Sequence, residues 1–357
     1  MILVSACHER NIWVMVDVVG NHMGNTNQDY GQNNPFNSGD HFHDYCIISD
    51  QDFQTKNQDR IENCRLAGLA DLKQENDWVR TTLLSWIHDL INKYHIDGIR
   101  IDTIPEVPKW FWNQFRESAG VYTIGEVFDG DMGYLAGYLG SLDAVLNYPF
   151  FFWVRDTVFN WKDMTNLRNY YNEWSRRLDL NKLNYLGNFV DNHDNARVLS
   201  WSGDWEQKKK HYKVVNAMAL TSLGIPIIYY GTEQYFAGGN DPNNREILWN
   251  NMDRNSDMYK FLSTIISARK QYQIWSQPQV ERYADYEIYA YSRGRFLVLL
   301  TNKVDGTVSK LISYHPFNAG EVICNIFYPS TDCITVQSNG FNIYLLNGEV
   351  KIYVPRA

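Results

Sequence analysis

The sequence predicts an α/β fold in which a parallel, barrel-like sheet is followed by a separate antiparallel β domain. Up to about residue 275, apolar strand-like runs alternate with helical patterns, which is typical of parallel strands buried on both faces. From about Gln277 onward the apolar residues alternate with a period of two, which is typical of antiparallel strands. A long polar stretch, Asn21 to Leu72, interrupts the first region and is a natural place for a small binding subdomain.

The individual elements follow from these patterns. Strands of the parallel sheet are predicted at Ile12–Val19, Asp97–Asp102, Val121–Val127, Leu142–Asn147, Tyr185–Val190 and Ile225–Tyr230. The clearest helix follows Asn76, a good N-cap, because apolar residues recur at helical spacing from Val79 to Ile91. Further helices are expected at Lys109–Ser118, Val154–Arg177, Gln207–Leu223 and Tyr259–Gln271. Antiparallel strands are expected at Glu287–Tyr291, Phe296–Thr301, Asn342–Leu346 and Val350–Val354.

Composition excludes some functions and leaves others open. The net charge of -8 argues against a nucleic-acid partner, which would need a basic face. No apolar run reaches the roughly 18 residues of a membrane span, and the start of the chain does not have the pattern of a signal peptide. The aromatic content is high, with 12 Trp, 24 Tyr and 17 Phe. Core packing and the stacking of sugar rings would both explain it, and composition does not choose between them.

The five cysteines leave one without a partner if the others form disulfides. Cys7 lies in a helical-looking stretch and is predicted to be a buried thiol. Cys46 and Cys64 flank a polar loop, and Cys324 and Cys333 lie in the β-rich tail. Two local disulfides are therefore predicted, which implies an oxidising compartment and a secreted, secretory or lysosomal protein.

Acidic and polar side chains gather where the predicted parallel strands end, which in α/β barrels is the end that carries the active site. A single acid at a strand end is more often a cap or a solvated loop residue. Three acids, two histidines and an arginine on one rim are harder to explain structurally, since buried charges need a function to offset their desolvation. The acidic and polar residues that gather at these strand ends are Asp17, Asn21, His22, Arg100, Asp102, Glu126, Asp191, Asn192, His193 and Asp194.

These residues lie in strings that resemble the four signature regions of the α-amylase family, glycoside hydrolase family 13. The strings are DVVGNHM (17–23), GIRID (98–102), IGEV (124–127) and FVDNHDNAR (189–197), while LADL (69–72) and GIPIIYYGTEQ (224–234) resemble two further regions. AGVYTIGEVFDGD (119–131), LNYPF (146–150) and AGGNDPNNRE (237–246) narrow the resemblance to the fungal-type, Taka-amylase-like group. The resemblance implies a (β/α)8 TIM barrel at 1–20 and 73–275, an inserted calcium-binding domain at 21–72 and a C-terminal antiparallel β-sandwich domain at 276–357.

The same resemblance implies retaining hydrolysis of internal α-1,4-glucosidic bonds in starch, glycogen and maltooligosaccharides. Asp102 corresponds to the nucleophile, Glu126 to the general acid and base, and Asp194 to the third acid, which grips sugar hydroxyls. In a retaining enzyme the two reacting carboxyl groups should lie roughly 5–5.5 Å apart. Substrate contacts and their support are implied for His22, Arg100, His193, Asp241, Arg245 and, behind Arg100, Asp17.

Calcium is the cofactor that the resemblance implies. Its ligands would be the side chains of Asn21, Glu62 and Asp71 and the backbone carbonyl of Glu106, which are the oxygen donors that calcium prefers. The ion would hold the insertion against the barrel beside the active site. The absence of a His/Cys cluster with zinc spacing in the sequence argues against a zinc hydrolase. The Cys46–Cys64 pair matches a disulfide position of the family.

The sequence departs from the fungal pattern at three points. Pro105 and Glu106 stand where the pattern has Lys-His, so the leaving-group side of the cleft would lose two cationic groups and gain a negative charge. Thr123 replaces a half-cystine of close relatives. Two strand–helix units of the barrel are expected to be absent before the first strand. The chain expressed alone is therefore expected to be poorly soluble and weakly active, because a six-stranded barrel exposes two sheet edges.

Two alternative functions remain at this point. A glucanotransferase of the same family would use a sugar instead of water as the acceptor. A relative that binds glucan without cleaving it would not require all three acids, which are present here. The expected partner is an α-glucan, with no nucleic acid and no membrane, and the chain is expected to be a monomer.

Overall fold

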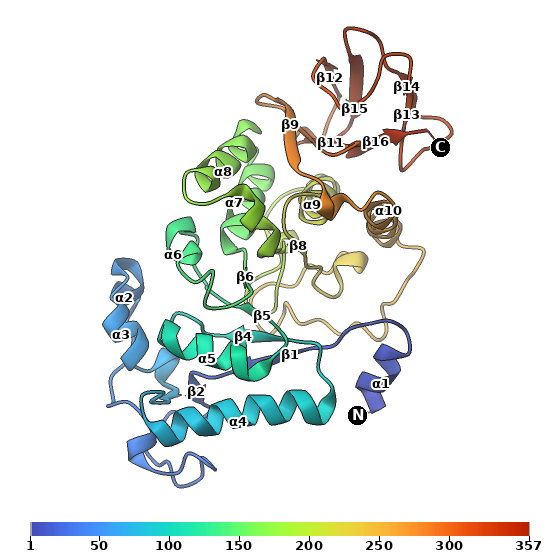
Figure 1. Cartoon of the computed structure of the whole chain (residues 1–357). Helices are drawn as coiled ribbons and strands as arrows, with labels where there is room; N and C mark the ends of the chain where they lie inside the picture. Colours follow the sequence, from blue (N-terminus) through green and yellow to red (C-terminus); the bar gives the residue numbers. More distant parts are fainter. Residues whose placement is uncertain (1, 357) are drawn as a thin grey trace. The chain divides into compact units, whose positions relative to one another are not determined.

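The computed structural model describes residues 2–356 and divides into two compact units, Met1–Leu146 and Asn147–Ala357 (Figure 1). Each unit carries parallel strands followed by helices. Among the described residues, no helix is both long and apolar enough to cross a membrane.

The first unit is built on parallel strands in the order β1-β4-β5-β6. Their bounds are β1 Met15–Val19, β4 Gly98–Asp102, β5 Tyr122–Gly125 and β6 Ala144–Leu146. Helices α1 Ile2–His8, α4 Asp77–Tyr94, α5 Lys109–Ala119 and α6 Met132–Ala136 accompany them. The Asn76 side chain caps α4 by accepting hydrogen bonds from two backbone N–H groups. Residues Val79, Leu83, Ile87 and Ile91 of α4 are buried, as their helical spacing predicts.

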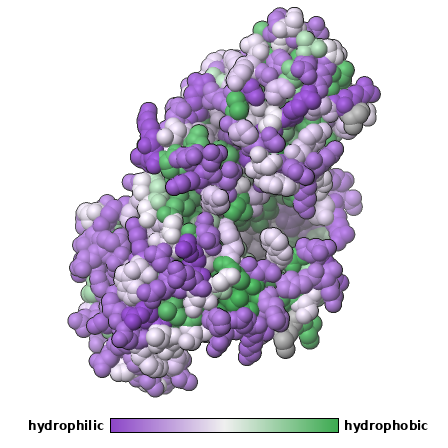
Figure 2. Space-filling model, in the orientation of Figure 1, coloured by the Kyte–Doolittle hydropathy of each residue, from purple (hydrophilic) through white to green (hydrophobic). Residues whose placement is uncertain are grey.

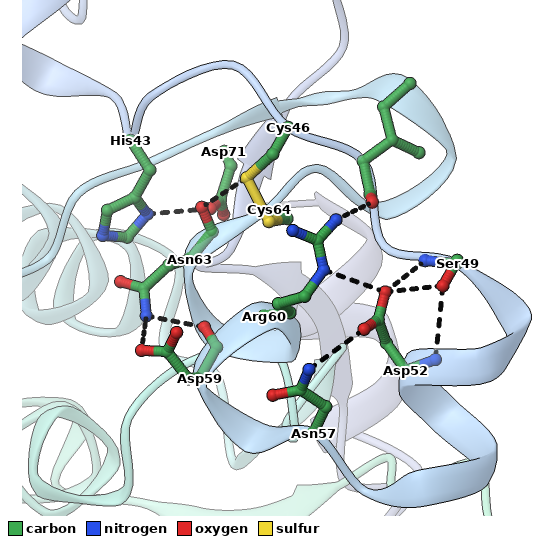
Figure 3. The surroundings of a disulfide bond; sticks show 11 residues. His43, Cys46, Ser49, Asp52, Asn57, Asp59, Arg60, Asn63, Cys64 and Asp71 are labelled. Atoms are coloured by element: carbon green, nitrogen blue, oxygen red, sulfur yellow. Dashed lines mark hydrogen bonds and ion pairs between the residues drawn. A yellow bond between two sulfur atoms is a disulfide. The ribbon is translucent and has the colours of Figure 1, made fainter.

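The insertion at 21–72 is a small, mostly irregular segment held by local contacts (Figure 3). Strand β2, His22–Met23, pairs with β3, Ala70–Asp71, and so returns the chain to the end of β1. Two short helices, α2 Asp50–Thr55 and α3 Gln58–Asn63, and the turns Gly39–His41 and Leu66–Gly68 lie between them. The predicted Cys46–Cys64 disulfide is confirmed, and Cys64 packs with Ile48 and Ile61 in a small core.

The second unit contains the remaining parallel strands, β7 Leu186–Asn188 and β8 Ile225–Pro226, which pair with each other. Its α-helices are α7 Tyr148–Phe159, α8 Thr165–Ser175, α9 Trp205–Thr221 and α10 Asp257–Gln271. Short 3-10 turns occupy Leu180–Tyr185, Val198–Ser200, Thr232–Gln234 and Ile274–Ser276. The single helix predicted at Val154–Arg177 is wrong: the chain leaves the helix after Phe159, and Trp161 adopts a left-handed conformation with φ of 54°.

The C-terminal part of this unit is a two-sheet β structure. Its larger sheet is antiparallel in the order β14-β13-β16-β11-β10-β9, and the smaller sheet pairs β12 with β15. Apolar residues of both sheets form one core, which includes Ile288, Leu299, Val308 and Ile343. The bounds are β9 Gln279–Ala284, β10 Ile288–Arg293, β11 Phe296–Thr301, β12 Thr307–Ile312, β13 Val322–Asn325, β14 Cys333–Thr335, β15 Phe341–Leu346 and β16 Lys351–Pro355.

Each predicted parallel strand is present, but most are shorter than the apolar run that predicts them. The predicted Cys324–Cys333 disulfide is also confirmed. Cys7 is the free cysteine, but it is only partly buried, so the expected burial of its thiol is wrong. Figure 2 shows one face of the molecule, where hydrophilic residues predominate and apolar residues form smaller separate areas.

Candidate active site

The strand register of the first unit places the candidate catalytic residues side by side. Asp17 on β1 is the register partner of Arg100 on β4, and Val19 is the partner of Asp102. Beyond the end of β5, the backbone N–H of Glu126 donates to the carbonyl of Ile101 at 2.8 Å. The side chains at 17, 100, 102 and 126 therefore gather where three neighbouring parallel strands end.

One guanidinium group joins the three carboxylates of this cluster. Arg100 Nη1 lies 2.8 Å from Asp17 Oδ1 and 2.5 Å from Asp102 Oδ1. Arg100 Nη2 lies 2.8 Å from Glu126 Oε2, an ion pair without the alignment of a hydrogen bond. The Arg100 side chain is only 12% exposed and that of Glu126 only 9%. Burial opposes the charged form of Arg100, but the charges of Glu126, Asp17 and Asp102 outweigh it and raise the pKa of the guanidinium.

The loop after Asp102 is fixed beside Glu126 by backbone contacts. The N–H of Ile104 donates to the Glu126 carbonyl at 3.1 Å, and Trp112 Nε1 donates to the Ile104 carbonyl at 2.9 Å. Gly125 allows this close approach, because a Cβ at that position would collide with the side chains of Ile104 and Leu142. A glycine directly before Glu126 is therefore a steric requirement of the loop.

His22 lies next to this cluster at the start of the insertion. Burial lowers the pKa of His22, while the negative charge of Asp102 acts in the opposite direction, so the two side chains are electrostatic neighbours. A neutral imidazole at this place can donate a hydrogen bond to a sugar hydroxyl through one ring nitrogen and accept one through the other.

The residues expected to bind calcium show a convergence of oxygen atoms. The Asn21 side-chain oxygen faces only acceptors, with Asp71 Oδ1 at 3.0 Å and the Glu106 carbonyl oxygen at 3.0 Å. Rotating the amide by 180° would turn these contacts into hydrogen bonds, whereas a cation among the three oxygens would satisfy the amide as it stands. The residues present therefore fit a hard cation such as calcium. Within residues 2–356, no group of three or more His, Cys, Asp or Glu side chains could hold a metal, so the fit depends on amide and carbonyl oxygens.

The fourth expected ligand is connected to this group only indirectly. Glu62 accepts a hydrogen bond from Gln58 Nε2 at 2.7 Å, and the same nitrogen lies 2.8 Å from the Pro105 carbonyl oxygen. Burial raises the pKa of the Glu62 carboxyl. Gln58 thus ties α3 of the insertion to the loop that carries Glu106.

Two further charged groups surround these oxygens. His43 lies 2.7 Å from Asp71 Oδ2 and 3.0 Å from Glu75 Oε2 (Figure 3 shows the Asp71 contact). Burial alone would lower the pKa of His43, but its contacts to Asp71 and Glu75 raise that pKa to about 9. Burial raises the pKa of the Glu106 carboxyl to about 8, and the charges of Glu126, Asp102 and Asp71 add to the shift. The departure from the fungal pattern at position 106 thus places a buried carboxyl near the catalytic acids.

The second unit brings together the other predicted substrate-binding residues. His193 Nε2 lies 3.2 Å from Asp194 Oδ2, and Arg245 Nη2 lies 3.7 Å from Asp194 Oδ1. Arg245 Nε also contacts Asp241 Oδ1 at 2.6 Å and donates to the His193 carbonyl at 3.2 Å. His193, Asp194, Asp241 and Arg245 therefore form one connected group of partly exposed side chains.

Residues to which the sequence assigned no role hold this group in place. Arg197, fully buried, contacts Glu246 Oε2 at 2.7 Å and lies over the Tyr229 ring at 4.2 Å. The Asn244 amide donates to the carbonyls of His193 and Asn195 at 2.8 and 2.9 Å. Arg197, Asn244 and Glu246 all lie inside the sequence strings that resemble α-amylase motifs, at 189–197 and 237–246. Their position in these motifs was the one sequence feature that could have indicated their supporting role. Asp191 is also structural, because its carboxylate accepts hydrogen bonds from the Val198 N–H and the Tyr212 hydroxyl.

Comparison with known proteins identifies the family to which this arrangement belongs. The model of the alpha amylase catalytic domain matches residues 1–296. The chain is 33% identical to alpha-amylase 2 of Schwanniomyces occidentalis over 99% of its own length and 71% of that protein, and 32% identical to the alpha-amylase of Saccharomycopsis fibuligera over 99% and 72%. The chain belongs to the α-amylase family. It is thus a glycoside hydrolase, and its alpha-amylase relatives support hydrolysis of internal α-1,4-glucosidic bonds.

The solved structures agree with this family membership. The structure of an alpha-amylase from Malbranchea cinnamomea is 31% identical, with a TM-score of 0.89, over 99% of this chain and 76% of that one. The parallel strands are therefore those of a TIM barrel, and the C-terminal strands form the β domain of the family fold. Coverage of relatives varies, since the chain spans only 30% of the beta/alpha-amylase of Paenibacillus polymyxa, to which it is 33% identical.

Proposed function

We propose that this chain cleaves internal α-1,4-glucosidic bonds of starch-like glucans with retention of configuration, using Asp102 as the nucleophile and Glu126 as the general acid and base. The observation that carries the proposal is the Arg100 guanidinium, which lies within 2.8 Å of both carboxylates. Carboxyl groups that share one guanidinium are close enough for the double displacement of a retaining glycosidase, for which roughly 5–5.5 Å is expected. That separation stays a prediction.

The proposed reaction has two balanced steps. In the first, an Asp102 oxygen bonds to the anomeric carbon, the glycosidic bond breaks, and Glu126 gives its proton to the departing sugar oxygen. In the second, Glu126 takes a proton from water, the water oxygen bonds to the anomeric carbon, and the bond to Asp102 breaks. Arg100 keeps Asp102 ionised and oriented as the nucleophile.

In this proposal the second unit binds the sugar hydroxyls. Asp194, His193, Asp241 and Arg245 offer carboxylates, an imidazole and a guanidinium, which suit the mixed donors and acceptors of sugar hydroxyl groups. The contacts of Arg197 and Asn244 fix the loop that carries Asp194, so these polar groups are held in place before substrate arrives.

Calcium is proposed as the resident ion at Asn21, Asp71 and the Glu106 carbonyl, with Glu62 as a further ligand. When bound, calcium would neutralise the facing oxygens and join the insertion to the loop after Asp102. The support for it is the Asn21 oxygen that faces only acceptors. The disulfides and the fungal relatives are consistent with an extracellular protein, and we propose that it is secreted and degrades starch.

The alternatives are less well supported. The Schwanniomyces occidentalis and Saccharomycopsis fibuligera relatives are alpha-amylases, so a glucanotransferase is not favoured. The three-domain cyclomaltodextrin glucanotransferase CldA is 23% identical with a TM-score of 0.83, a likeness that concerns the fold alone.

The test is the release of reducing sugar from soluble starch in the presence of calcium. Asp102→Asn and Glu126→Gln should each lower kcat by at least about a hundredfold, since each removes a group that takes part in bond making or proton transfer. Asp89→Asn and Glu117→Gln, exposed carboxylates on α4 and α5, are matched controls that should keep full activity.

Three results would count against the proposal. Substantial activity in Asp102→Asn would refute the role of nucleophile, and a first product in the β configuration would refute retention. If the unaltered chain binds glucan but releases no sugar, the glucan-binding alternative replaces hydrolysis.

A further inference from the structure

The second unit contains a pocket of about 370 Å³ between the end of α7 and the beginning of α9. Its walls come from residues 159–161 and from the segment 201–211. It is distinct from the group around Asp194, because none of His193, Asp194, Asp241 and Arg245 lines it. Its volume falls within the range of small-molecule sites, about 300–1,000 Å³.

Aromatic rings form the walls of this pocket. Trp161 and Trp201 both line it, and Trp161 is 48% exposed. The rings are held by neighbours: Trp161 lies 4.7 Å from the His211 ring, Phe159 lies 5.8 Å from Trp201, and the Arg155 guanidinium lies over Trp201 at 4.8 Å. Within residues 2–356, neither indole N–H of the two tryptophans has a hydrogen-bond acceptor, so both can donate to a ligand.

The polar groups of the pocket favour an uncharged ligand rich in hydroxyl groups. Lys208 Nζ is already occupied by the carbonyls of Leu199 and Trp201, each at 2.8 Å. His211 is buried and its pKa is lowered by that burial, so it adds no positive charge at neutral pH. Asp204 also lines the pocket, and its carboxylate accepts the Gln207 N–H at 2.9 Å as the cap of α9. The Asn160 amide donates to Asp156 Oδ1 at 2.8 Å and keeps further capacity to donate and accept, as do the Gln207 amide and the Ser202 hydroxyl.

The backbone of Trp161 closes helix α7 in a left-handed cap, in which its N–H donates to the Val158 carbonyl at 3.4 Å and the Lys162 N–H donates to the Thr157 carbonyl at 3.0 Å. Its φ of 54° lies in the left-handed region, where a bulky side chain is disfavoured and glycine is not. A half-exposed tryptophan in such a conformation gains little from burial to offset this cost.

We propose that the α7–α9 pocket is a second, non-catalytic glucan-binding site, in which a glucose ring stacks on Trp161 and its hydroxyls bond to Asn160, Ser202 and Gln207. The apolar face of a pyranose suits an indole ring, and its rim of hydroxyls suits amides and a serine. The inference rests on the proposed function, because it takes the ligand to be the polymer that the enzyme cleaves. The pocket segment 201–211 directly follows the loop that carries Asp194, so a glucan chain held there lies on the same unit as that loop.

The test measures glycogen binding by affinity electrophoresis in an Asp102→Asn background, so that the polymer in the gel is not cleaved. Trp161→Gly should weaken the glycogen affinity about tenfold relative to this background, which is typical of removing an aromatic anchor. Glycine fits the left-handed backbone, so the melting temperature should stay the same or rise, which separates lost binding from lost folding. Trp275→Ala is the matched control, because Trp275 is also 48% exposed but lies outside the pocket. It should change the affinity by less than about twofold.

A glycogen affinity of Trp161→Gly equal to that of Trp275→Ala would overturn the proposal. Gln207→Ala provides a second variant, and it should weaken binding without altering the melting temperature. Hydrolysis of maltoheptaose by the chain with intact Asp102 is measured in parallel. Loss of that hydrolysis would count against the proposed function alone, whereas the electrophoresis tests the pocket alone.

Discussion

Removing the Arg100 side chain tests whether one guanidinium organises the catalytic carboxylates. Arg100→Ala leaves the carboxylates of Asp17, Asp102 and Glu126 without the cation that now lies within 2.8 Å of each. Deleting one partner of a buried ion pair costs about 3–5 kcal/mol. Asp17 is 51% exposed and its share is screened by solvent, so the lower end, about 3 kcal/mol, is expected here.

The loss of the Arg100 ion pairs should lower both the free energy of unfolding and the catalytic rate. A loss of about 3 kcal/mol in the free energy of unfolding is measurable by urea denaturation. If a similar amount is lost in the transition state, kcat/KM on maltoheptaose falls about a hundredfold, since each 1.4 kcal/mol is a factor of ten. Arg100→Lys should recover only part of the activity, because a compact ammonium cannot contact three carboxylates as a planar guanidinium does.

Chemical rescue distinguishes an electrostatic role from a general structural one. Guanidinium ion, added to Arg100→Ala well below denaturing concentrations, should restore part of kcat, whereas ammonium at the same concentration should not. A kcat/KM of Arg100→Ala within about threefold of the unaltered chain would refute the reasoning. So would equal rescue by ammonium and guanidinium.

Two further predictions concern calcium and pH. Chelation by EGTA should lower the melting temperature by about 3–4 °C, since saturation of a site at about a hundred times its Kd adds about 2.7 kcal/mol and 357 residues unfold with an entropy of about 0.75 kcal/mol/K. Asp71→Asn should abolish this sensitivity to EGTA. An equal response of Asp71→Asn and the exposed-site control Asp59→Asn would argue against the site. Burial lowers the pKa of His211, outweighing its hydrogen bond to the Asn302 carbonyl, so the unfolded chain binds a proton there more readily. The contribution of neutral His211 to the free energy of unfolding is present above pH 6.5 and is lost as the pH falls from 6.5 toward the lower pKa of the folded state. His211→Gln should therefore flatten the curve of unfolding free energy against pH between pH 8 and 5. An unchanged slope in this variant would contradict the assignment to His211.

The sequence by itself determined the elements and the kinds of residue at their ends. Apolar runs predict every parallel strand, and the Asn76 cap with the spacing from Val79 to Ile91 predicts α4, because these signals are local. The short separations of the cysteines likewise predict both disulfides. The break at Trp161 was not predictable, since a tryptophan carries no local preference for a left-handed backbone.

Only the tertiary structure decided which side chains share one site within each unit. The register of β1 against β4 is a long-range pairing, and it sets Asp17 beside Arg100 across more than 80 positions of sequence. The facing oxygens of Asn21, Asp71 and Glu106, and the pocket between α7 and α9, likewise join segments far apart in the chain. Such proximities depend on strand pairing and on the burial of whole faces, which no short stretch of sequence encodes.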